Sequence, residues 1–320
     1  MRTTRPRRPR RARRPRPRAR LTSASSRCPP WTVESPGRRR GYETIGSLAR
    51  GFEAAVGIDV GGTKIAAGLV ELATGGVLER RQVPTDPKRG GAAVLDDCVA
   101  LAHELGAGRL PVGIGLCELV DLGGRPSSAD TVDWRTLDVV AAIDAPRVSL
   151  ESDVRAAARA EARFGAGAGR SPFLYVIVGS GASTCLVIDG EPYAGARGRA
   201  VVLGAPPVEV VASGRALQEL SGLDRAEDVL ASIEHDELVA SAAAALGQTL
   251  GVLANALDPT LIVLGGGLGG DAGFRARVAH QLAARVAYPA EPPLELVGSK
   301  LGADGGIVGA ALGAVARAAG

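Results

Sequence analysis

The octet Gly57–Lys64 (GIDVGGTK) combines residue types that suit phosphate binding. Asp59 stands in an apolar, strand-like run, two glycines follow, and Thr63 and Lys64 add further hydrogen-bond donors. Backbone N–H groups in a glycine turn can approach an anion closely. A carboxylate beside a phosphate requires a cation between them, so the octet predicts a magnesium nucleotide. An ordinary tight β-hairpin is the alternative interpretation.

The order of residues in this octet excludes two common phosphate-binding motifs. A Walker A loop places lysine before the hydroxyl residue, after a longer glycine loop, whereas Thr63 precedes Lys64 here. A dinucleotide fingerprint requires a third glycine that opens a helix, but residues 64–72 (KIAAGLVEL) are typical of a second strand. The segment therefore predicts a β-hairpin whose turn holds the phosphate.

Apolar periodicity beyond this hairpin predicts two similar α/β units. In the first unit three strands precede a helix, two further strands and an alanine-rich helix, at residues 54–60, 64–72, 77–85, 90–106, 111–121, 147–153 and 154–167. The second unit opens with two strands and continues with alternating helices and strands, at residues 172–181, 182–193, 236–257, 259–267, 271–286, 294–300 and 306–320. Two related units that each begin with a glycine hairpin predict a cleft between two domains.

The composition indicates a large globular chain with a basic N-terminal segment. Its 320 residues suffice for one large or two ordinary domains. Residues 1–53 are rich in arginine and proline and lack apolar periodicity, so we expect a disordered tail. The tail has no apolar run typical of a secretory signal. It is interpreted either as a nonspecific nucleic-acid-binding arm or as the product of a start codon assigned too far upstream, and we favour the second.

Cysteines, histidines and apolar runs argue against metal clusters and membrane spans. The four cysteines are far apart and form no C-x-x-C pair, which indicates a reducing cytoplasm and no structural zinc site. The three histidines lie in helix-like stretches without a partner motif, so we expect them at packing or surface positions. No run of about 18 apolar residues is uninterrupted, and no membrane span is expected.

Five segments occur in an order that closely resembles the ROK family of sugar kinases and repressors. They are GIDVGGTK at 57–64, ESD at 151–153, VGSG at 178–181, LDPTLIVLGGGL at 257–268 and LGADGGIVGAAL at 301–312. The resemblance implies an α/β, two-lobed actin-like ATPase (ribonuclease H-like) fold. ATP and a sugar would bind in the interdomain cleft, between lobes that close on each other. The final helix would pack against the first lobe.

The resemblance also divides the chain into three parts. A disordered tail occupies residues 1–53. A small N-terminal lobe, with the first phosphate loop and the catalytic aspartate, consists of residues 54–163 together with 300–320. A large lobe, residues 164–299, carries the second phosphate loop and the glycines beside the adenosine.

Individual roles follow from the same resemblance. Asp153, where a strand ends and a helix begins, corresponds to the catalytic aspartate that accepts the proton of a sugar hydroxyl. As an isolated acid it would be a helix N-cap. Asp59 is expected to reach Mg²⁺ through water. The expected ATP-binding residues are Gly61, Gly62, Thr63, Lys64, Gly179, Ser180 and Gly181 near the phosphates, and Gly265, Gly266 and Gly267 beside the adenosine.

The chain departs from the family pattern around the sugar. Val202 and Ala205 stand where the family has a sugar-binding glutamate and histidine, and the cysteine-rich zinc loop is absent, so no zinc is expected. Ser152 replaces an asparagine, and Ser180 replaces a threonine of the second phosphate loop. Glu209 corresponds to a further sugar-binding glutamate.

A second departure is Glu118, which with Cys117 replaces a glycine and a proline of most relatives. Because Val202 and Ala205 cannot form side-chain hydrogen bonds, we expect Glu118 to contact the sugar and to favour a protonated amine. A looser resemblance to kanosamine kinases agrees with this. A solvated loop residue is the alternative. The predicted substrate-binding residues are Glu118, Ser152, Asp153 and Glu209.

These features predict a cytoplasmic kinase that uses ATP and Mg²⁺ to phosphorylate the 6-hydroxyl of a hexose, and specifically of an amino-deoxyhexose such as kanosamine. The alternatives are a sugar-responsive regulator and an inactive sugar- or nucleotide-binding protein. Residues 1–53 contain too much arginine and proline for the helix-turn-helix of a repressor. The expected partners are a sugar and a second copy in a homodimer, with no specific nucleic acid and no membrane.

Overall fold

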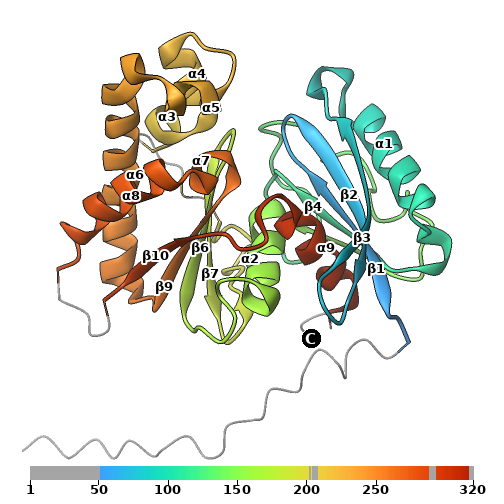
Figure 1. Cartoon of the computed structure of the whole chain (residues 1–320). Coiled ribbons are helices and arrows are strands. Elements are labelled where there is room, and N and C mark those ends of the chain that lie inside the picture. Colours follow the sequence, from blue (N-terminus) through green and yellow to red (C-terminus); the bar gives the residue numbers. More distant parts are fainter. Residues whose placement is uncertain (1–50, 202, 204–207, 288–292, 317–320) are drawn as a thin grey trace, which may run out of the picture. The chain divides into compact units, whose positions relative to one another are not determined.

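The computed structural model describes residues 51–201, 203, 208–287 and 293–316. The predicted tail, apart from its last three residues, lies outside this part of the chain, as do Val202 and Ala205. The described residues form two five-stranded sheets with helices packed against them (Figure 1). The sequence therefore predicted the α/β class correctly.

The first sheet has the strand order β3-β2-β1-β4-β5. Its strands are β1 (Ala54–Val60), β2 (Lys64–Glu71), β3 (Val77–Pro84), β4 (Val112–Leu116) and β5 (Val148–Ser152). The first three form an antiparallel meander, as predicted, whereas β1, β4 and β5 run parallel. Carboxyl ends of parallel strands meet at one edge of a sheet, so residues that follow β1, β4 and β5 lie together there.

The second sheet repeats this arrangement, with the order β10-β9-β6-β7-β8. Its strands are β6 (Phe173–Val178), β7 (Ala182–Ile188), β8 (Glu191–Pro192), β9 (Leu261–Gly265) and β10 (Glu295–Gly298). Here β6, β7 and β8 are antiparallel neighbours, and β6, β9 and β10 are parallel. Both sheets thus join an antiparallel meander to two parallel strands, which agrees with the prediction of two similar units.

Alternating strand residues build a separate core on each face of the first sheet. Val56 and Ile58 of β1 pack with α1 (Gly91–Glu104), whereas Ala55 packs with α9 (Gly305–Val315). The C-terminal helix α9 also contacts β4 and α2 (Asp153–Phe164). It therefore packs on the first sheet, as the sequence predicted.

Helix α2 contacts both sheets. Val154, Ala157 and Ala158 pack against one face of β6, β7 and β9, while other α2 residues contact α9 and β4. The boundary between the two lobes that the sequence predicted after residue 163 lies next to Phe164, the last residue of α2.

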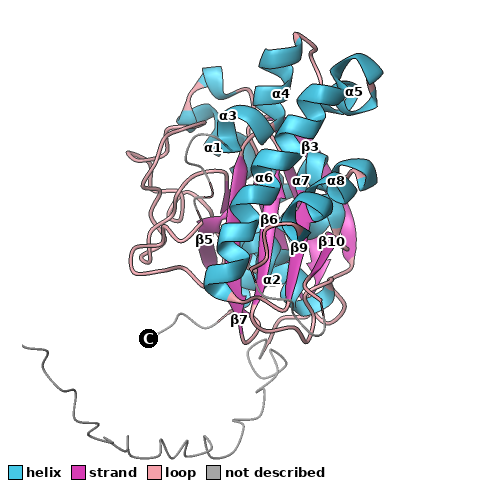
Figure 2. Ribbon diagram, turned by 90° about the vertical axis from the view of Figure 1, so that its left-hand side faces the viewer, coloured by secondary structure: helices cyan, strands magenta, loops and turns pink. Residues whose placement is uncertain are grey.

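The opposite face of the second sheet is covered by α6 (Asp236–Leu257) and α8 (Ala272–Ala283) (Figure 2). By length and composition alone, residues Ile233–Leu257 could cross a membrane, but one face of α6 packs in this core, as in a core helix of a globular protein. Further helices are α3 (Val208–Ala212), α4 (Gly214–Ser221), α5 (Ala226–Ala231) and α7 (Gly266–Gly270). Short 3₁₀ turns occupy Pro87–Arg89, Ala107–Arg109, Ile233–His235 and Gly302–Asp304.

The main difference from the sequence prediction lies after β4. We expected a strand over residues 111–121, but β4 ends at Leu116. Beyond it the chain folds back on itself: Val120 forms an isolated bridge with Pro126, and Ser127 N–H donates to the Leu119 carbonyl oxygen at 2.6 Å. These local hydrogen bonds replace the pairing that a longer strand would need.

Candidate active site

The segment predicted to be the first phosphate loop forms the turn of the β1–β2 hairpin, and the hairpin itself is confirmed. Gly61 N–H donates to the Lys64 carbonyl oxygen at 3.0 Å, and the buried Thr85 hydroxyl donates to the Gly61 carbonyl oxygen at 2.7 Å. Neither Gly61 nor Gly62 has a positive φ. A Cβ at Gly62 would approach Thr131 Cγ2 no closer than 3.4 Å. The backbone conformation does not require glycine, although a Cβ at Gly61 would lie only 3.3 Å from the Lys64 carbonyl oxygen, and close approach of a phosphate to these glycines stays a prediction.

Asp59 lies one residue before the end of β1, paired in register with Gly115 of β4. It faces the N-terminal turn of α9, where a Cβ at Gly306 would lie only 2.5 Å from the Asp59 carboxylate. Burial raises the pKa of Asp59 to about 6, although Lys64 and Arg80 oppose the shift. The carboxylate therefore lies in a confined space beside the phosphate loop.

Asp153 is the first residue of α2, directly after β5. Ser152, and not Asp153, occupies the N-cap position, so the interpretation of Asp153 as a simple N-cap is wrong. Burial, and then the negative charges of Asp59 and Glu118, raise its pKa to about 7, against the effect of the Val154 N–H. That N–H donates to Asp153 Oδ1 at 2.6 Å. Asp153 and Asp59 thus lie close enough for their charges to interact, at the carboxyl edge of parallel strands.

Ser152 does not use its hydroxyl to cap α2. It is buried and donates to the backbone carbonyl oxygen of Glu118 at 2.7 Å. Ser152 therefore fixes the loop after β4 relative to Asp153. A direct contact of this hydroxyl with the sugar stays a prediction.

The predicted second phosphate loop, Gly179–Gly181, joins β6 to β7 and packs on the start of α4. Gly214 N–H donates to the Gly179 carbonyl oxygen at 2.7 Å, and Arg215 N–H donates to the Ser180 carbonyl oxygen at 3.3 Å. The exposed Glu209 of α3 reaches the same loop, because a Cβ at Gly181 would lie 3.2 Å from its Oε1. Glu209 is therefore a neighbour of the phosphate loop.

The glycines at 265–267 lie beside that loop. The parallel pairing of β6 with β9 places Ile177 opposite Gly265. Gly266 has φ 80° and begins α7, and a Cβ there would lie 2.4 Å from the Val178 carbonyl oxygen. This position requires glycine both for its conformation and for the close backbone approach.

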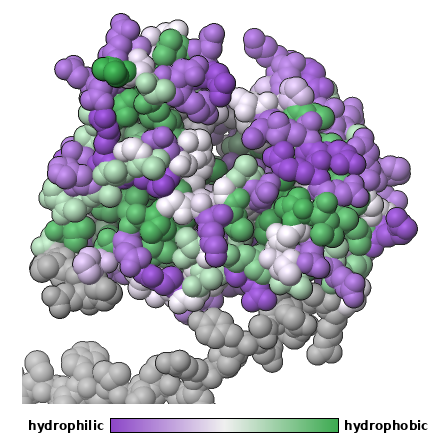
Figure 3. Space-filling view, viewed as in Figure 1, coloured by the Kyte–Doolittle hydropathy of each residue, from purple (hydrophilic) through white to green (hydrophobic). Residues whose placement is uncertain are grey.

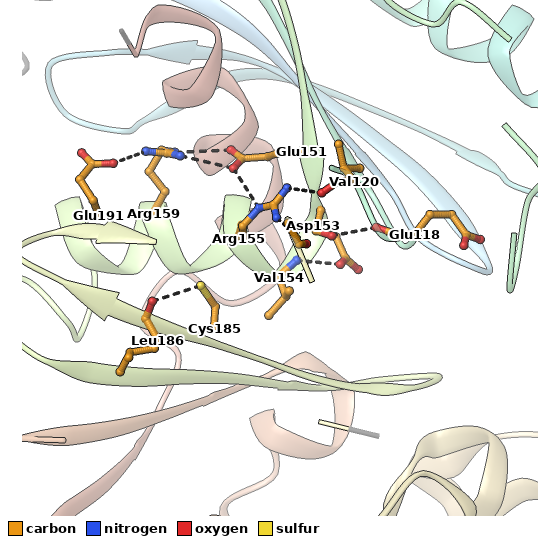
Figure 4. Close-up of polar contacts among 12 residues, drawn as sticks. Glu118, Val120, Glu151, Asp153, Val154, Arg155, Arg159, Cys185, Leu186 and Glu191 are labelled. Atoms are coloured by element: carbon orange, nitrogen blue, oxygen red, sulfur yellow. Dashed lines mark hydrogen bonds and ion pairs between the residues drawn. The ribbon is translucent and has the colours of Figure 1, made fainter. Parts of the chain in front are cut away.

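Glu118 differs most from its predicted role. Its side chain is 3% exposed, so the alternative of a solvated loop residue is wrong. Its carboxylate accepts hydrogen bonds from the Ser128 hydroxyl and from the backbone N–H groups of residues 130, 131 and 132. The carboxylate points away from Asp153 (Figure 4). With four donors already bound, it holds the loop after β4 and is not free to bind an amine.

The site also contains residues that the sequence reasoning missed. Thr85 supports the first phosphate loop, Thr131 lies beside Gly62, and Gly306 makes room for Asp59. Thr85 and Thr131 belong to no recognisable local pattern. Gly306 lies in the segment LGADGGIVGAAL, but its contact with Asp59 was not predicted.

The acidic side chains of the site suit Mg²⁺ that is bound together with phosphate and water. No group of three or more His, Cys, Asp or Glu side chains converges within the described ranges, so a metal held by protein ligands alone is not formed there. Mg²⁺ commonly needs only one or two carboxylates, together with water and substrate phosphates. Asp59 and Asp153 meet that requirement, because a cation near both would offset the repulsion that raises the pKa of Asp153.

The space-filling view shows this face of the molecule hollowed between the helices α3–α5 and the strands β1–β3 (Figure 3). Two repeated α/β units, each with a glycine turn between its first two strands, and a carboxylate pair define a protein of the actin-like ATPase class. Within that class, the ROK family model matches residues 55–316, and the chain belongs to the ROK family.

Known relatives agree with this assignment. The glucokinase of Streptomyces coelicolor is 30% identical over 311 residues, covering 80% of this chain and 96% of that protein. The bifunctional enzyme NanE/NanK of Brucella melitensis is 29% identical and covers 84% of the chain, which spans 55% of that longer relative. A ROK glucokinase from Streptomyces griseus, solved with glucose and AMPPNP, has a TM-score of 0.71 at 24% identity, covering 81% of this chain and 98% of its own. That likeness shows the fold.

Proposed function

We propose that the protein is an ATP-dependent carbohydrate kinase that phosphorylates the 6-hydroxyl group of a hexose. The observation that carries the proposal is Asp153 with its raised pKa, at the same sheet edge as Asp59 and the first phosphate loop. Membership of the ROK family and 30% identity to a glucokinase support it.

In this proposal Asp153 is the general base. A pKa of about 7 suits a base that must be deprotonated before the reaction and accept a proton during it. The hexose oxygen attacks the γ-phosphorus while its proton passes to the Asp153 carboxylate. A new P–O bond forms, the bond from the γ-phosphorus to the β,γ-bridging oxygen breaks, and ADP leaves.

The two glycine loops bind the nucleotide. Residues 61–64 and 179–181 contact the phosphates, and residues 265–267 lie beside the adenosine. Lys64, which is exposed, supplies positive charge next to Asp59. When bound, Mg²⁺ neutralises phosphate charge. Asp59 would hold it through water.

We further propose that the acceptor is an amino-deoxyhexose such as kanosamine. The support is electrostatic, since the carboxylates of Asp59 and Asp153 lie close enough for their charges to interact, and two acidic groups favour a protonated amine. Val202 and Ala205, which lie outside the described residues, offer no side-chain hydrogen bond to a neutral sugar. Glu118 makes no direct bond to the sugar, because its carboxylate already accepts four hydrogen bonds.

An ADP-release assay across plain, N-acetylated and amino-substituted hexoses tests both statements. We expect turnover, with a 6-phosphate identified by ³¹P–¹H NMR and amino sugars preferred over glucose. Asp153→Asn should lose this turnover, whereas the exposed Asp96→Asn on α1 should retain it. No ADP release with any hexose would refute the kinase, and a preference for glucose would refute the amino-sugar specificity alone.

Cytoplasmic location and a homodimer stay predictions. Cys98, Cys117 and Cys185 are free thiols, which suits a reducing compartment. Size-exclusion chromatography with light scattering measures the oligomeric state.

A further inference from the structure

Arg155 is a buried arginine in the first turn of α2, two residues after Asp153, and it is 5% exposed. Its Nη1 donates to the Gly198 carbonyl oxygen at 2.9 Å, and its Nη2 donates to the Val120 carbonyl oxygen at 3.0 Å. Its Nε lies 3.9 Å from the Glu151 carboxylate (Figure 4). One guanidinium therefore joins α2 to two separate segments of the chain.

These two segments are in direct contact. Gly198 has φ 74°, and a Cβ there would lie 2.3 Å from the Val120 carbonyl oxygen. Residues 121–123 and 127 of one segment and 196, 197 and 199 of the other line an open pocket of about 330 Å³. Arg155 thus hydrogen-bonds to one residue in each of the two segments that line this pocket.

We propose that Arg155 is a positioning residue that holds residues 118–127 and 195–199 in a fixed relation to Asp153, so that the acceptor hydroxyl meets the base. The proposal rests on the proposed kinase function. The planar guanidinium suits this role, because its donors have fixed directions and it remains charged when buried. One anchored segment follows β4 and is tied to Ser152, next to Asp153, through the Glu118 carbonyl oxygen. The other precedes residue 202 in the sequence.

The nucleotide side is held by other contacts. Thr85 hydrogen-bonds to Gly61 in residues 61–64, and the first residues of α4 hydrogen-bond to residues 179 and 180. No hydrogen bond from Arg155 reaches either phosphate loop within the described ranges. Loss of Arg155 should therefore affect sugar binding more than ATP binding.

Arg159 provides a matched control, because it is a largely buried arginine one turn further along α2. It pairs with Glu151 at 3.3 Å and with Glu191 at 2.7 Å, and its hydrogen bonds go to these two carboxylates. Glu151 keeps this partner when Arg155 is replaced. A purely structural role of a buried arginine should therefore appear in both variants.

The experiment compares Arg155→Met, Arg155→Lys and Arg159→Met in steady-state kinetics and in amide hydrogen exchange without ligand. We expect Arg155→Met to raise the KM for the hexose about 10- to 100-fold, the effect of losing one or two hydrogen bonds to a charged donor, with the KM for ATP nearly unchanged. Arg155→Lys should recover part of the loss. Arg159→Met should leave the hexose KM unchanged while lowering the Tm.

Hydrogen exchange in residues 118–127 and 195–199 should be faster in Arg155→Met than in Arg159→Met. Equal rises in both KM values, an unchanged hexose KM, or unchanged exchange in the two segments would each overturn the proposal. If Arg155→Met does not fold, the same measurements are made on Arg155→Lys. Failure of the unaltered protein to phosphorylate any hexose would refute the proposed function, and hydrogen exchange would still decide whether Arg155 holds the two segments.

Discussion

Replacing Glu118 with glutamine tests whether its carboxylate holds the loop or binds the substrate. Oε2 accepts from Asp130 N–H at 2.9 Å and from the Ser128 hydroxyl, and Oε1 accepts from the N–H groups of Thr131 and Val132 at 2.6 and 2.9 Å. Glutamine keeps one acceptor oxygen but turns an amide NH₂ toward the other donors. The Ser128 hydroxyl can rotate and accept from this NH₂, which leaves the Asp130 N–H without a partner.

One buried donor without a partner, together with weaker hydrogen bonds at the uncharged oxygen, should lower the free energy of unfolding by about 2–4 kcal/mol. For a domain of this size that corresponds to a Tm lower by roughly 5–12 °C, measured by scanning calorimetry. Turnover should fall for all sugars alike, because Thr131 lies against Gly62 of the first phosphate loop.

Glu104→Gln is the control for Glu118→Gln. The Glu104 side chain is 57% exposed and pairs with Arg81 at 3.7 Å, so its loss should cost less than about 1 kcal/mol. If Glu118→Gln keeps the Tm within about 1 °C and loses only its preference for amino sugars, the carboxylate contacts the substrate as the sequence predicted, and our structural reasoning is wrong.

The two aspartates and the metal give the remaining predictions. Because the pKa values of Asp153 and Asp59 are raised in the folded state to about 7 and about 6, the folded protein holds more protons than the unfolded chain above about pH 4. Its free energy of unfolding without ligands should fall as the pH rises from 4 through 7, and urea titrations that find no fall would contradict the raised pKa values. Asp153→Asn should lower kcat ~10²- to 10⁴-fold while calorimetry still detects ATP binding, and a variant within about threefold of the unaltered protein would show that another group is the base. Removing Mg²⁺ should stop ADP release and a zinc-selective chelator should not, whereas stoichiometric zinc in purified protein would disprove the second statement.

Local patterns were sufficient to predict most of the regular fold. The nearly continuous apolar runs in 54–60 and 64–71 reflect a buried sheet that packs on both faces, and the long periodic helix α6 was found at its observed bounds. Helices α3, α4 and α5 were missed because each has eight residues or fewer. So short a segment offers little periodicity to detect.

The site was predictable only where residues near in sequence act together. Asp59 with its glycine turn is such a case. The role of Glu118 depends on donors 10 to 14 residues away, in a loop without periodicity. Arg155 is similar, because its partners Val120 and Gly198 lie 35 and 43 residues away. In the sequence it is one more arginine in an alanine-rich helix.

The packing of α9 has a consequence for the order in which the protein forms during synthesis. Cβ atoms at Gly57 and Gly113 would lie 1.9 and 1.8 Å from α9 carbonyl oxygens, so this helix rests directly on the backbone of β1 and β4. A chain emerging from the ribosome has made those strands some 200 residues before it makes Gly305–Val315. Until then, the residues of the first sheet that pack against α9 lack this contact, and Asp59 lacks its neighbour Gly306. The first lobe to be synthesised is thus completed by the last helix, and a ribosome that stops before residue 305 leaves an apolar sheet face open to chaperones and to other unfinished chains.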